Sequence, residues 1–454
     1  MNFDREEEGV PERAQPVVAV GVMDLRREVS VRLNGEFTCE EGDGLSGAFT
    51  ARTEGQAILI TEGDGRETVR SSRIRLEGRP GSTFTLLNVT IGKNFHWERA
   101  EEQTFEGNLI LLSRGSGVMA VINEIPIEEY LRSVISSEMK ATAPMEFLKV
   151  HSILSRSWLL AALDRKQKKC GTSAKVSEGL QGAGEMVRWY EQEEHDLFDV
   201  CADDHCQRYQ GVTKIVSPDA ARAVKETEGK VIAFRGVICD ARYSKACGGI
   251  TETFRTAWEE KDVPYLIAVS DSEHVYPPII TEEEAHRWII SKPQAYCNVD
   301  DPAILAGILP DFDRETKEFF RWKTEYERDE LEAIMKEKSG IDFGVLREII
   351  PLRRGPSGRI SRLKITGSGG SMIVGKELEI RRWLSPTHLF SSAFIVETIA
   401  SPAGEIEKFI FHGAGWGHGV GLCQIGAAVM ATTGFKAEEI LSHYFPGTEV
   451  RKIY

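Results

Sequence analysis

The sequence lacks any long apolar run. No stretch approaches the roughly 18 residues that a membrane-spanning helix needs, so the sequence predicts no membrane span. An excess of positive charge is also missing, because 56 Lys and Arg residues face 70 Asp and Glu residues and the formal net charge is −14. Nucleic-acid binding relies on clustered Lys and Arg side chains that neutralise phosphates. We therefore expect no nucleic-acid partner.

Cysteine is sparse, with 8 residues among 454. Disulfide frameworks are small and much richer in cysteine, so this class of protein is excluded. The first residues do not have the pattern of a secretory leader either, because four of the first eight are acidic, whereas a leader begins with basic residues and continues with apolar ones. The chain is therefore expected to be either cytoplasmic or the mature form of an exported protein.

The pattern along the chain predicts several regions. Residues 1–15 are polar and predict a loose or disordered N-terminus, and residues 16–104 predict a β-rich region in which Asn34-Gly35 is a turn signal. Residues 275–345 are rich in charge and helix-like, which predicts a helical insertion or small lobe. The interleaving of strands and helices favours an α+β fold with mixed sheets and helices around a substrate cleft.

Two helices joined by a short link are expected after residue 126. Apolar residues recur at spacings of 3, 4 and 7, which is typical of one helix face. These residues are Ile127, Tyr130, Leu131 and Val134. Pro144 suits the first position of the second helix, and Glu138 falls in the link. Apolar surroundings favour the neutral form of a carboxylic acid, which can then donate a proton. A surface glutamate at a helix end is the alternative.

Two histidines and two cysteines lie within twelve residues. They are His195, Cys201, His205 and Cys206. Zinc favours tetrahedral coordination by nitrogen and sulfur, and four protein ligands close its shell, so the set predicts a structural zinc site. A closed shell leaves no position for an activated water, which argues against a zinc hydrolase. Unligated thiols beside chance histidines are the alternative.

Glycine occupies every second position from 413 to 421. In an extended segment this spacing clears one face of side chains and lets another group approach the backbone closely. The opposite face would carry Trp416 and His418, and a bare strip beside a tryptophan suits a sugar ring. A tightly packed internal strand or bulge explains the same spacing. No G-x-G-x-x-G register fits, so a dinucleotide fingerprint is excluded.

Gly248-Gly249 predicts a tight turn or bulge after a polar run that begins at Tyr243. Polar residues of this run, including Lys245, are expected to line a cleft. A nucleophilic Cys247 would need a base and an oxyanion hole that no motif places, which disfavours covalent catalysis through this thiol.

These segments, in this order, resemble the stage II sporulation protein D (SpoIID) family, which includes amidase enhancers. The likeness covers roughly residues 105–270 and 320–454, whereas 275–320 does not match well. It rests on residues 105–109 (FEGNL), 121–131 (VINEIPIEEYL), 137–139 (SEM), 147–158 (approximately), Gly248-Gly249, 417–427 (GHGVGLCQIGA) and 443–448 (HYFPGT). The resemblance implies a core in two parts, at 105–274 and at 346–454 with the glycine-rich segment.

Four positions depart from the family's pattern. Lys140 stands where a proline is common, Lys245 and Cys247 stand where hydroxyl residues are frequent, and Cys423 replaces a usual serine. These departures bear on the shape of the loop after Glu138 and on substrate contacts.

The resemblance implies a lytic transglycosylase. Such an enzyme cleaves the bond between N-acetylmuramic acid (MurNAc) and N-acetylglucosamine (GlcNAc) in peptidoglycan and forms 1,6-anhydro-MurNAc. The family's catalytic glutamate maps onto Glu138 as general acid/base, and its zinc ligands map onto His195, Cys201, His205 and Cys206. Substrate-binding roles are expected for Arg156, Tyr243, Lys245, His418 and Gln424.

The expected partners are peptidoglycan glycan strands and a cell-wall amidase, and the expected location is the cell envelope. A non-catalytic amidase enhancer that binds peptidoglycan is the alternative function.

Overall fold

The computed structural model describes residues 12–40, 44–92, 98–169, 179–182, 184–190, 195–203, 205–310 and 318–454. The chain divides into two compact units. Unit 1 comprises Met1–Glu8, Gly171–Glu191 and Ile232–Val450, and unit 2 comprises Gly9–Cys170, Gln192–Val231 and Arg451–Tyr454. Each unit is described by itself below.

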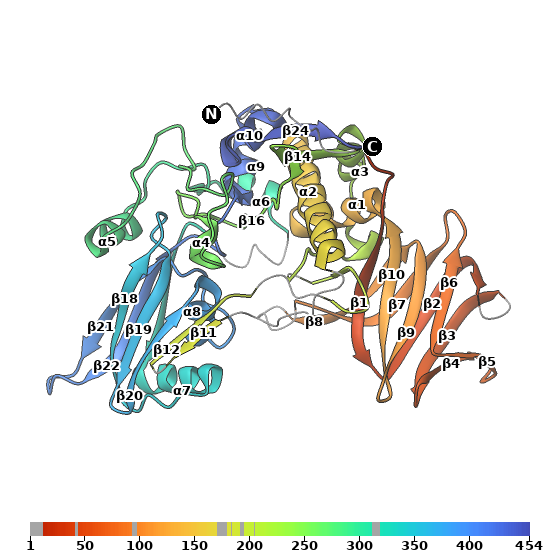
Figure 1. Cartoon of the computed structure of the whole chain (residues 1–454), viewed down its shortest axis with the longest axis horizontal. Helices are drawn as coiled ribbons and strands as arrows, with labels where there is room; N and C mark the ends of the chain where they lie inside the picture. The colour runs from red at the N-terminus through yellow and green to blue at the C-terminus, as the bar shows by residue number, and fades with distance from the viewer. Residues whose placement is uncertain are drawn as a thin grey trace, which may run out of the picture. The chain divides into compact units, whose positions relative to one another are not determined.

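Unit 2 contains an eleven-stranded sheet (Figure 1). Nine strands follow the order β13-β1-β10-β9-β6-β2-β3-β4-β5, while β7 pairs with β2 and β8 pairs with β7. Buried and exposed residues alternate along much of β2, with Val29, Val31 and Leu33 facing the core, as expected for a strand with one covered face. The strands are β1 (Val17–Arg26), β2 (Glu28–Cys39), β3 (Leu45–Glu54), β4 (Ala57–Glu62), β5 (Glu67–Ser71), β6 (Arg73–Gly78), β7 (Thr83–Ile91), β8 (Arg99–Glu106), β9 (Asn108–Gly115), β10 (Val118–Pro126) and β13 (Val200–Cys201).

The turn predicted at Asn34-Gly35 is wrong, because both residues lie inside β2. The pairing of β2 with β3 shifts register between Leu33 and Phe37, and Gly35 has φ 109° there. The Asn-Gly pair therefore marks a β-bulge, where a strand bends without ending. Beyond the bulge, β2 pairs with β6 at Phe37–Cys39.

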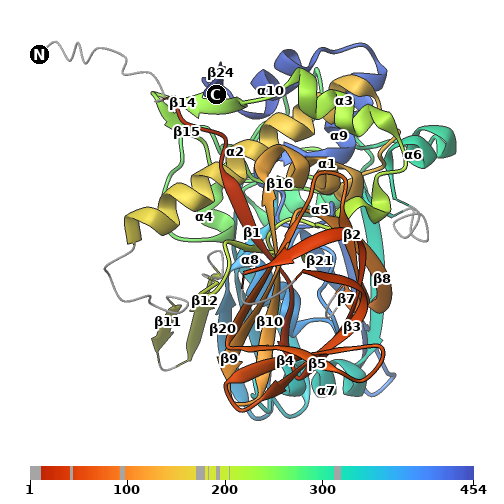
Figure 2. The same ribbon diagram turned by 90° about the vertical axis from the view of Figure 1, so that its right-hand side faces the viewer.

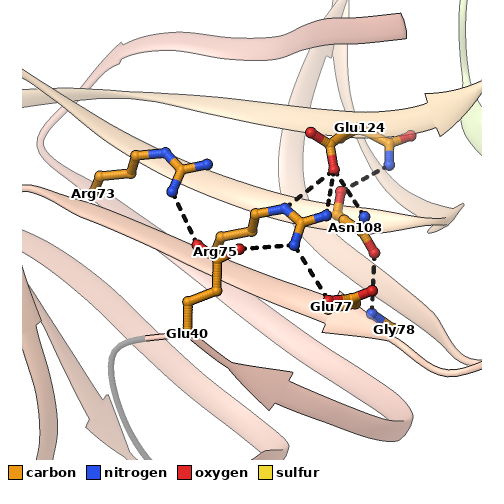
Figure 3. Close-up of polar contacts among 8 residues, drawn as sticks. Glu40, Arg73, Arg75, Glu77, Gly78, Asn108 and Glu124 are labelled. Atoms are coloured by element: carbon orange, nitrogen blue, oxygen red, sulfur yellow. Dashed lines mark hydrogen bonds and ion pairs between the residues drawn. The ribbon is translucent and has the colours of Figure 1, made fainter. Parts of the chain in front are cut away.

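A polar network joins β6, β9 and β10 of this sheet to Glu40, the residue that follows β2 (Figure 3). The Arg75 guanidinium donates to Glu124 (Nη2–Oε2, 2.7 Å) and to Glu40 (Nη1–Oε1, 2.8 Å). Asn108 donates to the same Glu124 oxygen at 2.8 Å. Burial works in the other direction, yet the hydrogen bonds from Asn108 and Arg75 lower the pKa of Glu124 below its usual value.

The helices of unit 2 gather at one end of its sheet (Figures 1 and 2). They are α1 (Ile127–Glu138), α2 (Met145–Lys169) and α3 (Pro218–Glu226), with a short 3₁₀ helix η1 (Gly211–Lys214). Two helices with a short link were predicted here and are confirmed, with one difference: Glu138 is the last residue of α1 and lies outside the link.

Three of the sheets in the described part of the chain lie wholly within unit 1. The largest has the order β11-β12-β20-β19-β18, the second has the order β17-β22-β21, and β16 pairs with β23 in parallel. Figure 2 shows β11 and β12 beside β20. The strands are β11 (Gly179–Gly182), β12 (Glu185–Arg188), β16 (Tyr243–Ser244), β17 (Arg321–Glu327), β18 (Leu346–Arg354), β19 (Ile360–Gly367), β20 (Gly370–Gly375), β21 (Phe394–Ala400), β22 (Ile406–Ala414) and β23 (Leu422–Cys423). A further sheet, β15-β14-β24, is formed by β14 (Lys230–Phe234), β15 (Val237–Ile238) and β24 (Glu449–Lys452).

Helices stand at both ends of unit 1, with α9 and α10 at one end and α7 at the other (Figures 1 and 2). The helices are α4 (Phe254–Ala257), α5 (Glu282–Ile290), α6 (Pro302–Ile308), α7 (Arg328–Ser339), α8 (Glu377–Trp383), α9 (Gln424–Thr432) and α10 (Ala437–Tyr444). Thr281 caps α5 with a reciprocal capping box to Glu284. The range 275–345 holds α5, α6 and α7, and also β17, which pairs with β22 along its full length.

The predicted α+β class with mixed sheets is confirmed. The β-rich character of residues 16–104 continues beyond 104, because β9 and β10 pair with β6 and β1 in the same sheet. The expected loose N-terminus lies mostly outside the described residues. Within the described part of the chain, no helix combines the length and the apolar character that crossing a membrane requires.

Candidate functional site

Glu138 ends α1 on the helix's buried face. It follows Val134 by four residues and Leu131 by seven, so the same periodicity that buries those side chains directs Glu138 inward. The residue is 7% exposed. Its Oε1 atom accepts a hydrogen bond from the Arg208 backbone N–H at 2.9 Å. The carboxyl group is therefore held from outside its own helix.

The segment that contacts Glu138, residues 206–210, is itself fixed to α1 and α2. Gln207 accepts from the Tyr130 hydroxyl (3.2 Å) and donates to the Ser155 carbonyl (3.4 Å). The Gln210 N–H donates to Ser133 Oγ at 3.1 Å. We call residues 206–210 the strap. Its contacts on both sides of Arg208 fix the N–H that binds Glu138.

The Cys/His set predicted from the sequence leads into the strap and shares Cys206 with it. Its four donor atoms all lie within 4.8 Å of one another. Cys206 Sγ is 3.4 Å from His195 Nε2 and 3.4 Å from His205 Nδ1, and Cys201 Sγ is 3.8 Å from His205 Nδ1. Two thiols and two imidazoles at these separations match the donor set and the spacing of a tetrahedral metal site. The structure therefore brings the four predicted ligands together.

The sheet positions this cluster. Cys201 belongs to β13, which pairs in parallel with β1 opposite Gly21. Phe198 packs on the bare backbone of Gly21, where a Cβ atom would stand within 2.6 Å of its ring, and its own ring lies 4.5 Å from that of His195. Contacts with the Cys206 thiol, and then with His195 and His205, outweigh burial and lower the pKa of Cys201 well below its usual value.

Arg156, predicted to bind substrate, is fully buried in α2. Its guanidinium forms a two-pronged ion pair with Glu128 of α1, Nε–Oε1 at 2.8 Å and Nη2–Oε2 at 2.6 Å. It also donates to the Lys230 carbonyl at 2.9 Å, and the Tyr454 hydroxyl donates to Glu128 at 2.5 Å. Arg156 and Glu128 therefore form a structural ion pair that holds α1 on α2.

The other predicted substrate residues belong to unit 1. Tyr243 pairs with Leu422 where β16 meets β23, and Gln424 begins α9 immediately after β23. Lys245 follows β16 and is 9% exposed, and its carbonyl accepts from the Ile425 N–H at 3.1 Å. The structure thus brings Tyr243, Lys245 and Gln424 to one pair of strands. Beside them, Ser244 Oγ is buried without a hydrogen-bond partner among the described residues.

His418 lies next to Trp258, with ring centroids 4.9 Å apart. Its Nδ1 atom accepts from the Val420 N–H at 3.0 Å. Burial, and then the nearby charges of Arg242 and Arg359, lower the pKa of His418 well below its usual value. The imidazole is therefore neutral near pH 7, with its proton on Nε2.

The glycine-rich segment is not extended, so the expectation of a bare strip is wrong. Gly415, Gly417, Gly419 and Gly421 all have φ between 75° and 89°. Every second residue therefore adopts the left-handed conformation that side chains disfavour, and this explains the alternation. The space beside Gly419 is filled by the guanidinium of Arg359, which a Cβ atom there would overlap. The alternative interpretation, tight internal packing, accounts for the segment.

The structural role of Arg359 was not predicted from the sequence. It is fully buried and donates to the carbonyls of Cys247 (2.9 Å) and Gly417 (3.2 Å) and to Ser357 Oγ (3.0 Å). Ser357 in turn donates to Glu252 at 2.6 Å. One cation thus joins the Gly248-Gly249 turn to the glycine-rich segment. Neither a motif nor the spacing signals it, because its partners are backbone carbonyls far away in the chain.

The structure assembles the predicted residues as two groups. Glu138, Arg156 and the Cys/His set belong to unit 2, and Tyr243, Lys245, His418 and Gln424 belong to unit 1.

Two family models match the chain. Residues 115–234 match the family described as stage II sporulation protein (SpoIID), and residues 252–421 match a domain of unknown function, DUF8618. Glu138, Arg156 and the Cys/His set fall in the first range, and His418 falls in the second. Tyr243, Lys245 and Gln424 lie outside both.

Relatives align over longer stretches. An amidase enhancer from Bacillus subtilis is 25% identical over 336 residues, which are 70% of this chain but only 40% of that protein. An uncharacterized protein from Brachyspira hyodysenteriae is 24% identical over 96% of this chain and 93% of its own length. A stage II sporulation protein D from Bacillus amyloliquefaciens is 21% identical over 72% of this chain and 75% of its own length.

The SpoIID family model, the amidase enhancer and the stage II sporulation protein D carry names that belong to the family identified from the motifs. That resemblance is confirmed: residues 115–234 match the SpoIID family model, and relatives with these names align with the chain.

Proposed function

We propose that this protein is a peptidoglycan lytic transglycosylase in which Glu138 is the general acid and base. The family and the relatives' names indicate a function related to the cell wall. The observation that carries the finer proposal is the setting of Glu138. It is a buried carboxyl group at the end of a helix, within the family's S-E-M motif, and the strap fixes it through the Arg208 N–H at 2.9 Å.

In this mechanism Glu138 acts twice. Its carboxyl proton passes to the oxygen that links MurNAc C1 to the next GlcNAc, and the C1–O bond breaks. The resulting carboxylate then accepts the proton of the MurNAc C6 hydroxyl while that oxygen bonds to C1. A 1,6-anhydro ring forms and Glu138 regains its proton, so no water is consumed. Because the nucleophile belongs to the same sugar, its attack is favoured by proximity and a second carboxylate is not required.

A zinc ion held by His195, Cys201, His205 and Cys206 is the second part of the proposal. Four protein donors would close a tetrahedral shell, so the ion would stabilise structure. The strap begins at Cys206, and Arg208 follows two residues later. A metal that fixes Cys206 would thereby fix the N–H that positions Glu138.

Substrate contacts are proposed for Tyr243, Lys245, His418 and Gln424. The buried Ser244 hydroxyl, which has no partner among the described residues, supports a polar ligand at this strand pair. The Lys245 ammonium would attract the lactyl carboxylate of MurNAc, which offsets repulsion from a chain of net charge −14.

The test compares wild type with Glu138→Gln on purified glycan strands, with and without stem peptides, and identifies the products by mass spectrometry. Anhydro-MurNAc ends from wild type are expected. Loss of general acid catalysis costs about 10²- to 10⁴-fold, so the variant should be nearly inactive. The matched control is Glu129→Gln, in the same helix, where Glu129 pairs with Arg132. Equal loss in both variants would contradict the assignment.

A second function is favoured by the amidase enhancer among the relatives. In that case the protein would bind peptidoglycan and stimulate a cell-wall amidase without cutting glycan. Both proposals place the protein in the cell envelope. Retained binding with no cleavage, and amidase stimulation that survives Glu138→Gln, would favour the enhancer over the transglycosylase.

A further inference from the structure

A second cluster of metal-binding side chains lies in unit 1, at positions that no motif connects. It consists of Cys247, Asp271, Cys297 and Cys423. Their four ligand atoms lie within 4.8 Å of one another, and all four residues are buried. Cys247 and Cys297 have their sulfurs 3.8 Å apart, and both are free thiols.

The four residues come from separate segments. Cys247 stands before the Gly248-Gly249 turn, and Asp271 follows the bridge between Ile250 and Ser270. Cys297 lies in the loop after α5, and Cys423 ends β23 immediately before α9. A cation bound by all four would link these segments at one point.

Backbone N–H groups already point at the ligand atoms. The Cys247 N–H donates to Cys423 Sγ (3.2 Å), and the Gly249 N–H donates to Cys247 Sγ (3.4 Å). The Cys297 N–H donates to one oxygen of Asp271 at 2.8 Å, and the Tyr444 hydroxyl donates to the other. Such outer contacts orient the ligands of metal sites and stabilise their anionic forms. Each oxygen retains a further lone pair that can face a cation.

The geometry suits zinc. A Zn–S bond of about 2.3 Å in a tetrahedron places two sulfurs about 3.8 Å apart, which matches the Cys247–Cys297 separation. Soft thiolates select zinc over magnesium or calcium, and a carboxylate oxygen is an accepted fourth ligand. The buried guanidinium of Arg359 and the partly buried one of Arg321 reach the turn beside the cluster. Arg359 donates to the Cys247 carbonyl (2.9 Å), and Arg321 donates to the Gly248 carbonyl (3.0 Å). They offset the negative charge of three thiolates and a carboxylate.

We propose that Cys247, Asp271, Cys297 and Cys423 bind a second, structural zinc ion. Four buried protein ligands close the coordination shell, so the ion serves stability and not the activation of water. It fixes the start of α9, where Gln424 lies, to the turn after Lys245. The site stands independently of whether Glu138 cleaves glycan.

The first test counts metal in the wild-type full chain, expressed with zinc and desalted, by native mass spectrometry and elemental analysis. Two zinc ions per chain are expected, one for each cluster. X-ray absorption at the zinc edge should show sulfur together with both nitrogen and oxygen ligands. No bound zinc, iron at this cluster, or a Cys247–Cys297 disulfide seen as a loss of two hydrogens would overturn the proposal.

Variants then separate the clusters. Cys201→Ser with Cys206→Ser should retain one zinc ion with three sulfur ligands, whereas Cys297→Ser should lose that ion and keep the other. Cys239→Ser is the matched control, because Cys239 is a buried free cysteine outside both clusters and should keep the wild-type count. A Cys201/Cys206 double variant that remains folded without any zinc would contradict the second site. If Cys297→Ser does not fold, the wild-type count and absorption spectrum still decide.

Discussion

The two clusters are built by the chain in different ways. His195, Cys201, His205 and Cys206 lie within twelve consecutive residues, whereas Cys247, Asp271, Cys297 and Cys423 come from four segments spread over unit 1. The first cluster includes an exposed imidazole, at His205, and the second is buried throughout. The first cluster, which we call the local cluster, leads directly into the strap that holds Glu138. The second cluster, which we call the distant cluster, lies beside the Gly248-Gly249 turn and the start of α9.

The difference shows what each arrangement can control. A local cluster fixes one loop, and through it one N–H, so its loss should affect chemistry at Glu138. A cluster assembled from distant segments closes long loops of the chain, so its loss should affect the stability of unit 1.

Among changes that distinguish the two clusters, the largest effect is expected from Cys201→Ser combined with Cys206→Ser. Removing both thiols releases the end of the strap at Cys206, and the Arg208 N–H no longer holds Glu138 in place. We expect glycan cleavage to fall by about 100-fold, as for lost orienting contacts at a metal site. The measurements are the cleavage rate, the zinc content and the melting temperature. Full activity in a zinc-free double variant would show that the local cluster does not position Glu138.

A smaller effect is expected from Arg359→Met. This change removes hydrogen bonds beside the distant cluster and leaves the local cluster unchanged. The change removes the hydrogen bonds that Arg359 donates to the carbonyls of Cys247 and Gly417. Each buried polar group left unsatisfied lowers the free energy of unfolding by about 1–3 kcal/mol. We expect the melting temperature to fall by several degrees, as calorimetry would show, while the zinc of the local cluster is kept. Arg353→Met is the control, since Arg353 is half exposed and pairs with Glu260. Equal changes in the two variants would contradict the role of Arg359.

The smallest effect concerns pH and has opposite signs in the two units. In unit 2, hydrogen bonds from Asn108 and Arg75 outweigh burial and lower the pKa of Glu124 below 4.5, so its stabilisation is present above that pH and is lost as pH falls through the folded value. In unit 1, burial raises the pKa of Glu252 above 4.5, so stability is lost as pH rises from 4.5 through the folded value. Relative to wild type, Glu124→Gln should therefore lose melting temperature as pH rises from 3 towards 7, and Glu252→Gln should gain it. The same sign for both variants in calorimetry would contradict these assignments.

The local features could be predicted from the sequence. A helical period places Ile127, Tyr130 and Val134 on one face, and this periodicity is fixed by neighbours within the helix, so α1 and α2 were predicted. The Cys/His set was predicted for the same reason, because its residues are close in the sequence.

The remaining features depend on distant partners. Glycine at every second position fits an extended strand, and it also fits a chain in which alternate residues have left-handed φ. Only the tertiary structure, in which Arg359 packs on Gly419, distinguishes the two conformations. Arg156 is polar and was expected to bind substrate, but its charge is matched by Glu128, 28 residues away on another helix. The hydrogen bond from the Cys297 N–H to Asp271 likewise forms only when the loops are folded.

The most direct measurement is the mass of the glycan ends formed by wild-type protein in water enriched in oxygen-18. If Glu138 directs attack by the MurNAc C6 hydroxyl, the new ends are anhydro-MurNAc and carry no oxygen-18, and Glu138→Gln forms none. Reducing ends that contain one oxygen-18 atom would show that water attacks C1, and the transglycosylase proposal would be wrong.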